Sequence, residues 1–196
     1  GTDVAAGECT YTKRLGDKNY KKLSEELLQL NDEFDFMACL PGNTYIDEKS
    51  DDFKKVLDSY GFKVSRAKDL SSIKGISKVS LYHEGGVPKD VRMALQKEWD
   101  DKMEVAVAGR TWLDFTAKGA NKGNALAMIQ EHFGITPEET VAFGNADNDI
   151  TMLRQAKYGY AVAGSSPGLK KEAYEVIGAM EEDAVLKKLK EILAEL

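Results

Sequence analysis

The sequence predicts an α/β protein in which a mixed α+β module precedes a layered domain with a parallel sheet. In residues 15–117, helical and strand patterns follow one another without strict alternation, which is typical of an α+β arrangement. After Lys118, short apolar segments alternate strictly with helical ones, as in doubly wound parallel sheets. Residues 1–14 form a short strand-like opening segment. We therefore expect three regions, 1–14, 15–117 and 118–196.

Local signals predict the elements of the α+β module in order. A helix is expected to begin at Asp17, a favoured N-cap residue, because apolar residues then recur at spacings of three and four. This stripe consists of Tyr20, Leu23, Leu27 and Leu30. The next segments predict a strand (FDFMACL), a turn with a short strand (PGNTYID), a helix closed by Gly61 (DDFKKVLDSYG) and another strand (GISKVSLYHEGG). A helix with Pro88 in its first turn and a hairpin through Gly109 and Arg110 complete the module.

The residues after Lys118 predict alternating helices and strands that end in a helix. The expected elements are a helix over 123–133, a strand over 140–143, a helix over 149–156, a strand over 158–163, a helix from Pro167, a strand over 175–177 and a final helix. Apolar faces are expected at Ala125, Leu126, Ile129 and Phe133 in the first helix, and at Val185, Leu189, Ile192 and Leu196 in the last. Core positions are also expected for Met93, Met128 and Met152. Three strands are few for such a sheet, so we expect part of it to lie outside these residues.

The composition argues against several classes of partner. With 27 basic and 33 acidic residues, the formal net charge is −6, which disfavours a broad nucleic-acid or anionic-membrane surface. Cys9 and Cys39 are isolated, so neither a disulfide framework nor a zinc site is indicated. The sequence has no apolar run of membrane-spanning length, and its first residues do not resemble a secretory signal. We therefore expect a cytoplasmic protein that binds neither nucleic acid nor membrane.

The segment FGNADNDITML, residues 143–153, combines four oxygen-bearing side chains at one turn. They are Asn145, Asp147, Asn148 and Asp149. The turn follows an apolar strand, and ligands of open parallel sheets bind beyond the carboxyl ends of strands. Carboxylate and carboxamide oxygens are hard ligands that suit Mg²⁺, which completes its octahedron with water and substrate phosphate. The turn is therefore a candidate magnesium site.

Two other interpretations of this turn compete with a magnesium site. Asp and Asn are favoured helix N-caps, so any single one of the four could simply begin the helix at Ile150, although one cap does not need four such residues. An EF-hand calcium loop would place Gly where Ile150 stands and Glu where Ala156 stands. The calcium interpretation therefore fails, and the capping interpretation remains open.

Lys122 is the second candidate for a chemical role. It opens the helix in GANKGNAL, where a cation opposes the helix dipole at a cost of about 0.3 to 1 kcal/mol. Such a placement is explained if the lysine faces a bound anion that the helix N-terminus also attracts. The alternative is a solvated lysine that tolerates the small penalty. The spacing is not that of a Walker A lysine. Ser166, before Pro167, is interpreted as an N-cap.

Together these two segments resemble motifs of a known family. KGNAL followed by GITPEETVAFGNADNDITMLRQAKYGYAVAG is similar to the third and fourth motifs of the haloacid dehalogenase (HAD) superfamily, in its Cof-like sugar-phosphatase subfamily with an α/β cap. The resemblance covers residues 119–178 by motif, and 15–117 by length and element order only. It implies a Rossmann-like, HAD-like core that is incomplete at its amino-terminal side. Residues 1–14 would be a remnant of a core hairpin, 15–117 the cap and 118–196 the carboxyl-terminal part of the core.

The resemblance implies Mg²⁺-dependent hydrolysis of small phosphorylated metabolites, such as sugar phosphates, through an aspartyl-phosphate. Lys122 would be the catalytic lysine that steadies nucleophile and phosphate. Asn145, Asp149 and Asn148 would belong to the Mg²⁺ site. Asn145 stands where the family most often has Asp, which removes one negative charge and should weaken metal affinity.

The D-x-D-G-T motif that supplies the family's nucleophile does not occur in this sequence. We therefore expect the nucleophile to lie outside the chain and these residues alone to be inactive. A phosphoryl transferase of the same superfamily is a close variant of this hypothesis. The alternative is a noncatalytic binding or regulatory module that keeps the fold. In such a module Asn145 would indicate that tight metal binding is no longer required.

Overall fold

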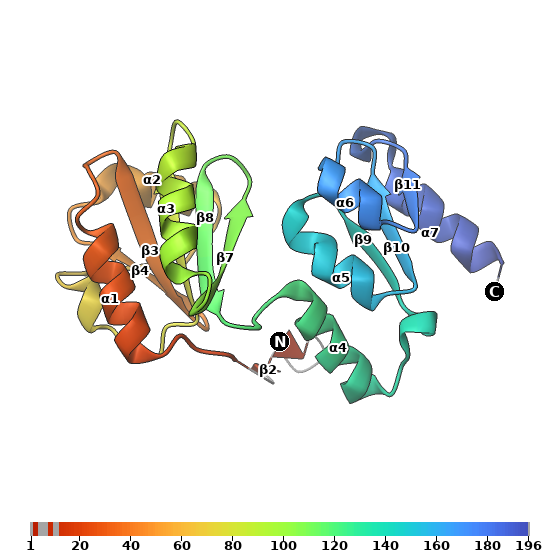
Figure 1. Ribbon diagram of the computed structural model, residues 1–196, viewed down its shortest axis with the longest axis horizontal. Coiled ribbons are helices and arrows are strands. Elements are labelled where there is room, and N and C mark those ends of the chain that lie inside the picture. The colour runs from red at the N-terminus through yellow and green to blue at the C-terminus, as the bar shows by residue number, and fades with distance from the viewer. Residues whose placement is uncertain (1, 4–7, 10–11, 196) are drawn as a thin grey trace. The chain divides into compact units, whose positions relative to one another are not determined.

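The computed structural model describes residues 2–3, 8–9 and 12–195. The chain divides into two compact units, Gly1–Ala120 and Asn121–Leu196 (Figure 1). None of the helices in the described part of the chain is long and apolar enough to cross a membrane.

The first unit contains a six-stranded sheet of order β5-β4-β3-β6-β8-β7. Its strands are β3 (Phe34–Leu40), β4 (Asn43–Asp47), β5 (Val64–Ala67), β6 (Lys78–His83), β7 (Met103–Ala108) and β8 (Trp112–Ala117). All neighbours are antiparallel except β4 and β5, which run parallel. Its helices are α1 (Asp17–Leu27), α2 (Asp51–Ser59) and α3 (Lys89–Trp99), with a 3-10 turn η1 (Leu70–Ser72). A two-residue antiparallel pair, β1 (Thr2–Asp3) with β2 (Glu8–Cys9), precedes them.

Alternation along β6 and β8 places apolar side chains on one face of this sheet. On β6, Val79 and Leu81 lie on the same side as their register partners, which are Phe36, Ala38, Leu113 and Phe115. These residues join the buried side chains of α1 and α3 in the main core of the unit. The helix stripe predicted from Tyr20 onward supplies part of that core, and the predicted hairpin of β7 and β8 is confirmed.

Helix α2 packs on the opposite face of the sheet. Phe53 and Leu57 of α2 are buried with Met37 and Ile46, and the cluster reaches Tyr82 and Trp112 at its margin. The other half of this face, over β6, β8 and β7, carries polar side chains.

The second unit is a three-stranded, fully parallel sheet of order β11-β10-β9. Its strands are β9 (Val141–Gly144), β10 (Tyr158–Val162) and β11 (Glu175–Ile177). Its helices are α4 (Lys122–Phe133), α5 (Ile150–Gln155), α6 (Pro167–Glu172) and α7 (Ala184–Ala194), with 3-10 turns η2 (Pro137–Glu139), η3 (Asp147–Asp149) and η4 (Met180–Glu182). Helices α5 and α6 pack around Ala161 on one side of β10, whereas Ala184 of α7 packs near Tyr160 and Val162 on the other. The predicted alternation of strands and helices is confirmed.

Of the apolar face predicted for α4, Leu126 packs against the core, whereas Ala125, Ile129 and Phe133 are exposed. Exposure is 41% for Met128, 48% for Ile129 and 68% for Phe133, although all three were expected in the core. The helix instead buries Gly123 and Gln130. The Gln130 amide donates to Thr140 Oγ1 at 2.8 Å, so a polar residue lies inward without an unpaired group.

Other sequence predictions also need correction. Of the face predicted for α7, Ile192 packs partly against the sheet, whereas Val185 and Leu189 are exposed and Leu196 lies outside the described residues. Met93 on α3 is 56% exposed. Asp17 is the first helical residue rather than the N-cap, which is Gly16. The short strand β5 was not predicted.

Candidate active site

The oxygen-rich turn lies at the carboxyl end of β9, and Asp149 organises it. The Asp149 side chain is almost completely buried, with 2% of the residue exposed. Its Oδ2 accepts backbone N–H groups from Asn145 at 2.9 Å and from Ala146 at 3.2 Å. Gly144, just before them, is also necessary, because a Cβ there would lie 2.8 Å from the Cβ of Asp149. The buried carboxylate therefore folds the turn back on itself.

Lys122 reaches the same carboxylate from the start of α4. Its Nζ donates to Asp149 Oδ1, while half of the lysine side chain remains exposed. Burial by itself would raise the pKa of Asp149. The hydrogen bonds from Lys122 and from the amides of Asn145 and Ala146 outweigh burial, so the pKa of this carboxyl lies below its ordinary value. Asp149 is thus an anion that holds a partly exposed ammonium group beside the turn.

Gly123 allows α4 to approach α5 closely enough for this contact. Its N–H donates to Thr151 Oγ1 at 3.1 Å. A Cβ on Gly123 would lie 2.4 Å from the backbone oxygen of Thr151, which is far inside any permitted contact. Neither Gly123 nor Thr151 was predicted as part of the site. The glycine in KGNAL was a usable signal, because Gly lowers helix stability and needs a packing reason inside a helix.

We expect Gly123→Ala to separate the amino-terminal end of α4 from α5. The clash should outweigh the better helix propensity of alanine and lower the free energy of unfolding by about 2 kcal/mol. Thermal melting measures this change. By NMR, adding Asp149→Asn to Gly123→Ala should no longer shift the Lys122 side-chain resonances, because the contact between Lys122 and Asp149 is already lost. Gly164→Ala is the matched control, because nothing lies within 4 Å of the position a Cβ would take there. Equal melting temperatures for the two variants would contradict the steric role of Gly123.

The remaining side chains of the turn have distinct positions. Asp147 Oδ1 accepts a hydrogen bond from Ser166 Oγ at 2.5 Å, and Ser166 Oγ in turn accepts the N–H of Leu169 at 3.2 Å. The predicted N-cap role of Ser166 is confirmed, and Asp147 ties α6 to the turn. Asn145 is exposed and Asn148 is half-buried at the same turn. The structure therefore brings all the predicted site residues to one end of β9, with Lys122 and Asp149 in direct contact.

The donor set fits part of a magnesium shell. Asp149 supplies a carboxylate, and Asn145 and Asn148 carry carboxamide oxygens, all of the hard class that Mg²⁺ prefers. Within the described residues, however, no group of three or more His, Cys, Asp and Glu side chains is placed to hold a metal ion. Mg²⁺ in phosphoryl-transfer sites commonly uses one or two protein carboxylates together with substrate phosphate. The turn suits one side of such a site.

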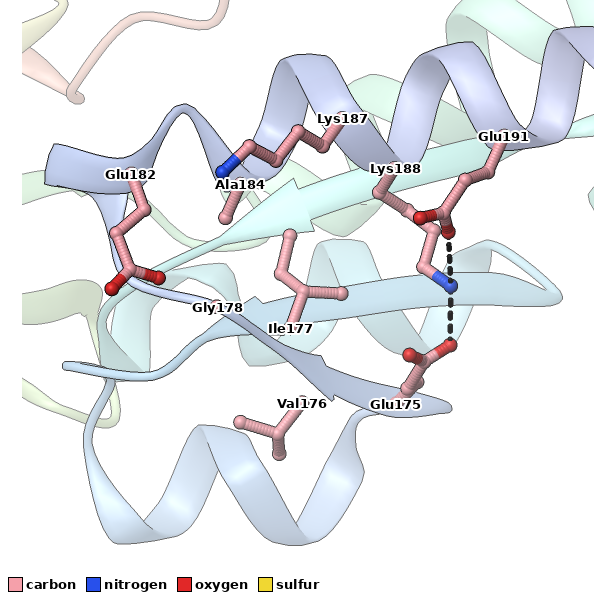
Figure 2. A pocket seen from close by; sticks show the side chains of 9 residues that line it. All are labelled: Glu175, Val176, Ile177, Gly178, Glu182, Ala184, Lys187, Lys188 and Glu191. Carbon is pink, nitrogen blue, oxygen red and sulfur yellow. Dashed lines mark ion pairs between the residues drawn. The ribbon is translucent and has the colours of Figure 1, made fainter.

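A separate hollow of about 250 Å³ lies between β11 and α7 (Figure 2). Lys188 is fixed there between Glu175 at 2.8 Å and Glu191 at 3.2 Å. The hydrogen bond with Glu175 is the main reason that the pKa of Lys188 is raised. Its ammonium group also lies 5.3 Å from the ring centre of Tyr160. These partners give Lys188 a structural role in docking α7.

A parallel sheet whose strand ends in an oxygen-rich turn, with a lysine held against the buried aspartate of that turn, defines an α/β protein of the phosphoryl-transfer class. The chain belongs to the haloacid dehalogenase-like hydrolase family, whose model matches residues 2–189. The predicted HAD-like fold and the predicted place among the Cof-like phosphatases of that superfamily are confirmed.

Individual relatives agree with this assignment. The chain is 27% identical over 195 residues to 5-amino-6-(5-phospho-D-ribitylamino)uracil phosphatase YbjI of Escherichia coli, covering 98% of this chain and 72% of that protein. It is 34% identical over 97 residues to an HMP-PP phosphatase of Klebsiella pneumoniae, covering 48% of this chain and 36% of that protein. The solved structure of the HAD subclass IIB sugar phosphatase BT4131 matches with a TM-score of 0.80 at 21% identity, covering 95% of this chain and 70% of that one. All three of these proteins are named as phosphatases.

Proposed function

We propose that the protein is a Mg²⁺-dependent phosphatase that hydrolyses small phosphorylated metabolites, such as sugar phosphates, through an aspartyl-phosphate. The observation that carries the proposal is the contact of Lys122 with the buried Asp149 at the carboxyl end of β9. Relatives named as phosphatases of a phosphoribityl compound and of HMP-PP support a small phosphorylated substrate. The net charge of −6 argues against a nucleic-acid partner.

The nucleophile of this reaction would lie outside residues 1–196, because no D-x-D-G-T motif occurs in them. Two features of the second unit support further sheet structure beside β9. Strand β9 lies at one end of the sheet, and among the described residues it pairs only with β10. Its other edge can therefore accept a further strand. Apolar residues of α4, including Ile129 and Phe133, are also exposed. A further strand and its connections would cover both.

The residues of this chain would position the phosphoryl group and stabilise the negative charge that develops on it. Asp149 fixes the ammonium group of Lys122, which can then hold an anionic phosphoryl oxygen and the attacking carboxylate together. Because Asp149 is already ionised and hydrogen-bonded, this arrangement needs no reorganisation when the substrate binds. Mg²⁺, when bound, would neutralise phosphoryl charge, with Asp149, Asn145 and Asn148 on its protein side.

The direct test uses the native protein as its source produces it, with any residues that precede Gly1. Phosphate release from a panel of phosphomonoesters is measured with Mg²⁺ and again with excess chelator. We expect release that requires Mg²⁺ and that is lost in Lys122→Ala. Transfer of phosphate to a second hydroxyl instead of water would identify the transferase variant of the same chemistry.

The second candidate is a noncatalytic HAD-fold binding or regulatory module, and the observation that favours it is Asn145. A carboxamide in place of the family's usual carboxylate lowers the charge at the metal position. If the native protein releases no phosphate from the panel with Mg²⁺, while it remains folded, the module interpretation replaces the enzymatic one.

We expect Asn145→Asp to tighten Mg²⁺ binding by about tenfold, the scale on which metal sites respond to changes around their ligands. The added carboxylate lies at the exposed rim of the turn, so folding should be unaffected. Calorimetric titration of the native protein with Mg²⁺ measures the change. Asp147→Asn is a useful comparison, because Asp147 is engaged with Ser166 and should affect the turn rather than the metal. Unchanged Mg²⁺ affinity in Asn145→Asp would remove Asn145 from the proposed site.

A further inference from the structure

Strand β11 forms the edge of the second unit's sheet that lies opposite β9 in the strand order. On β10, the backbone of Tyr158 points to β9, since its N–H donates to the carbonyl of Thr140. Backbone groups point alternately to the two sides of a strand, so those of Ala161 point to β11. Ala161 is the register partner of Val176 and therefore bonds to the two residues that flank Val176. The N–H and C=O of Val176 consequently face away from the sheet.

Beside this edge, the unit carries an exposed ring and a hollow. Tyr174 is 65% exposed, and its ring meets that of Tyr160 edge-on at 6.1 Å, on the side of the sheet that α7 covers. The hollow of about 250 Å³ between β11 and α7 lies on that side and reaches Gly178 (Figure 2). A side chain on Gly178 would point to Glu182 and Ala184, which both line the hollow. Glycine therefore keeps this end of the hollow open.

Two copies of this edge are complementary when they pair antiparallel about an axis at Val176. The outward N–H and C=O of Val176 then bond to the same groups of the second copy, and its side chain, in a residue 45% exposed, packs against its counterpart. Residues equally distant from the axis lie opposite each other and project to the same side, so Tyr174 meets the open end of the hollow at Gly178 of the second copy. An axis at Glu175 would instead set two carboxylates against each other.

The charges along the edge also match between two copies. At one end of the hollow, Glu175 and Glu191 share the single ammonium group of Lys188, at 2.8 and 3.2 Å, so this group of three carries one excess negative charge. Lys187 extends toward the other end, next to Ala184 (Figure 2). Antiparallel pairing brings the Lys187 end of one copy to the Glu175 end of the second, so opposite charges approach each other. A parallel arrangement would align like charges.

We propose that the protein forms a two-fold symmetric dimer through β11, with Val176 on the axis and each Tyr174 ring seated at the hollow of the second copy. The contact closes after two copies, because both use the same edge. It is independent of the proposed function, since the candidate active site lies at the turn after β9, at the other end of the strand order. The small size of the contact implies an affinity in the micromolar range.

The test is sedimentation equilibrium of the native protein, with any residues that precede Gly1, across micromolar concentrations. We expect a monomer–dimer equilibrium. Val176→Lys should weaken dimerisation at least about tenfold, because two ammonium groups would meet at the axis. Leu193→Lys is the matched control, since it adds the same charge at a 60% exposed apolar residue of α7, and it should dimerise as the parent does. Thermal melting checks that both variants are folded.

Mixing oppositely charged variants tests the position of the axis. Val176→Glu alone should also dimerise poorly, whereas an equimolar mixture with Val176→Lys should form a heterodimer, because each side chain at this position meets its own counterpart. Native mass spectrometry separates the mixed species by mass. A protein that stays monomeric up to about 1 mM, a dimer that survives in Val176→Lys, or a mixture of folded variants that forms no heterodimer overturns the proposal.

Discussion

Replacing Lys122 with alanine should lower the turnover of the native protein by about two to four orders of magnitude while leaving it folded. The loss follows because a preorganised cation beside the transferring group stabilises charge that develops only in the transition state. The structural effect should be modest, about 1 to 2 kcal/mol, because water can take the place of the half-exposed lysine beside Asp149 Oδ1 while the two backbone amides still hold Oδ2. Steady-state phosphate release and thermal melting, measured on the same preparations, separate the two effects.

Lys170→Ala is the control for Lys122→Ala, because Lys170 is an exposed lysine of α6 in the same unit. Its turnover should match that of the parent. Lys122→Arg should recover little activity, since the bulkier guanidinium cannot occupy the same point beside Asp149. Near-parental turnover in Lys122→Ala would show that the contact with Asp149 is only structural, and the assignment of Lys122 to catalysis would be wrong.

The strand and helix pattern of the second unit could be predicted because each signal was local. Each signal lies within a few residues: a proline after a serine for α6, a glycine after the last helical residue for α4, and a short run of aromatic and small apolar residues for β10. The inward face of α4 depends on tertiary contacts instead. There Gln130 is buried because Thr140 and Gln155 meet its amide, and no local pattern announces those partners.

In the candidate site too, the residue types could be predicted from local sequence, whereas their contacts could not. Lys122 and Asp149 were named from residue types and a family resemblance, since polar residues at a strand end are visible in sequence. Their direct contact was not foreseen, because it depends on how closely α4 approaches α5 at Gly123. The use of Asp149 Oδ2 to hold two backbone amides was equally hidden. From the sequence, Asp149 is predicted only as a metal ligand, whereas in the fold its carboxylate also holds the turn together.

That second role changes what Asp149→Ala should do. Truncation leaves the amides of Asn145 and Ala146 without their acceptor in a buried place and removes the partner of Lys122. We expect a loss of about 2 to 3 kcal/mol in the free energy of unfolding, together with a turnover loss at least as large as that of Lys122→Ala. A sequence-only view, in which Asp149 is a ligand at the rim, expects the turnover loss with folding intact. Denaturant unfolding of Asp149→Ala and Lys122→Ala measures the free energy of unfolding of each variant. A clearly larger loss in Asp149→Ala supports the role of Asp149 in holding the turn, and equal small losses support a role as metal ligand alone.

Asp149→Asn isolates the charge, because the carboxamide oxygen can still accept an amide N–H. The pKa of Asp149 in the folded protein lies below its ordinary value, so its ionisation stabilises the fold above that ordinary value, and the contribution disappears as the pH falls through the folded pKa. The difference in melting temperature between the parent and Asp149→Asn should therefore be largest near neutral pH and shrink as the pH falls toward 3, measured with chelator present. A difference that stays constant over that range would mean that the turn is held by shape and hydrogen bonding without the charge.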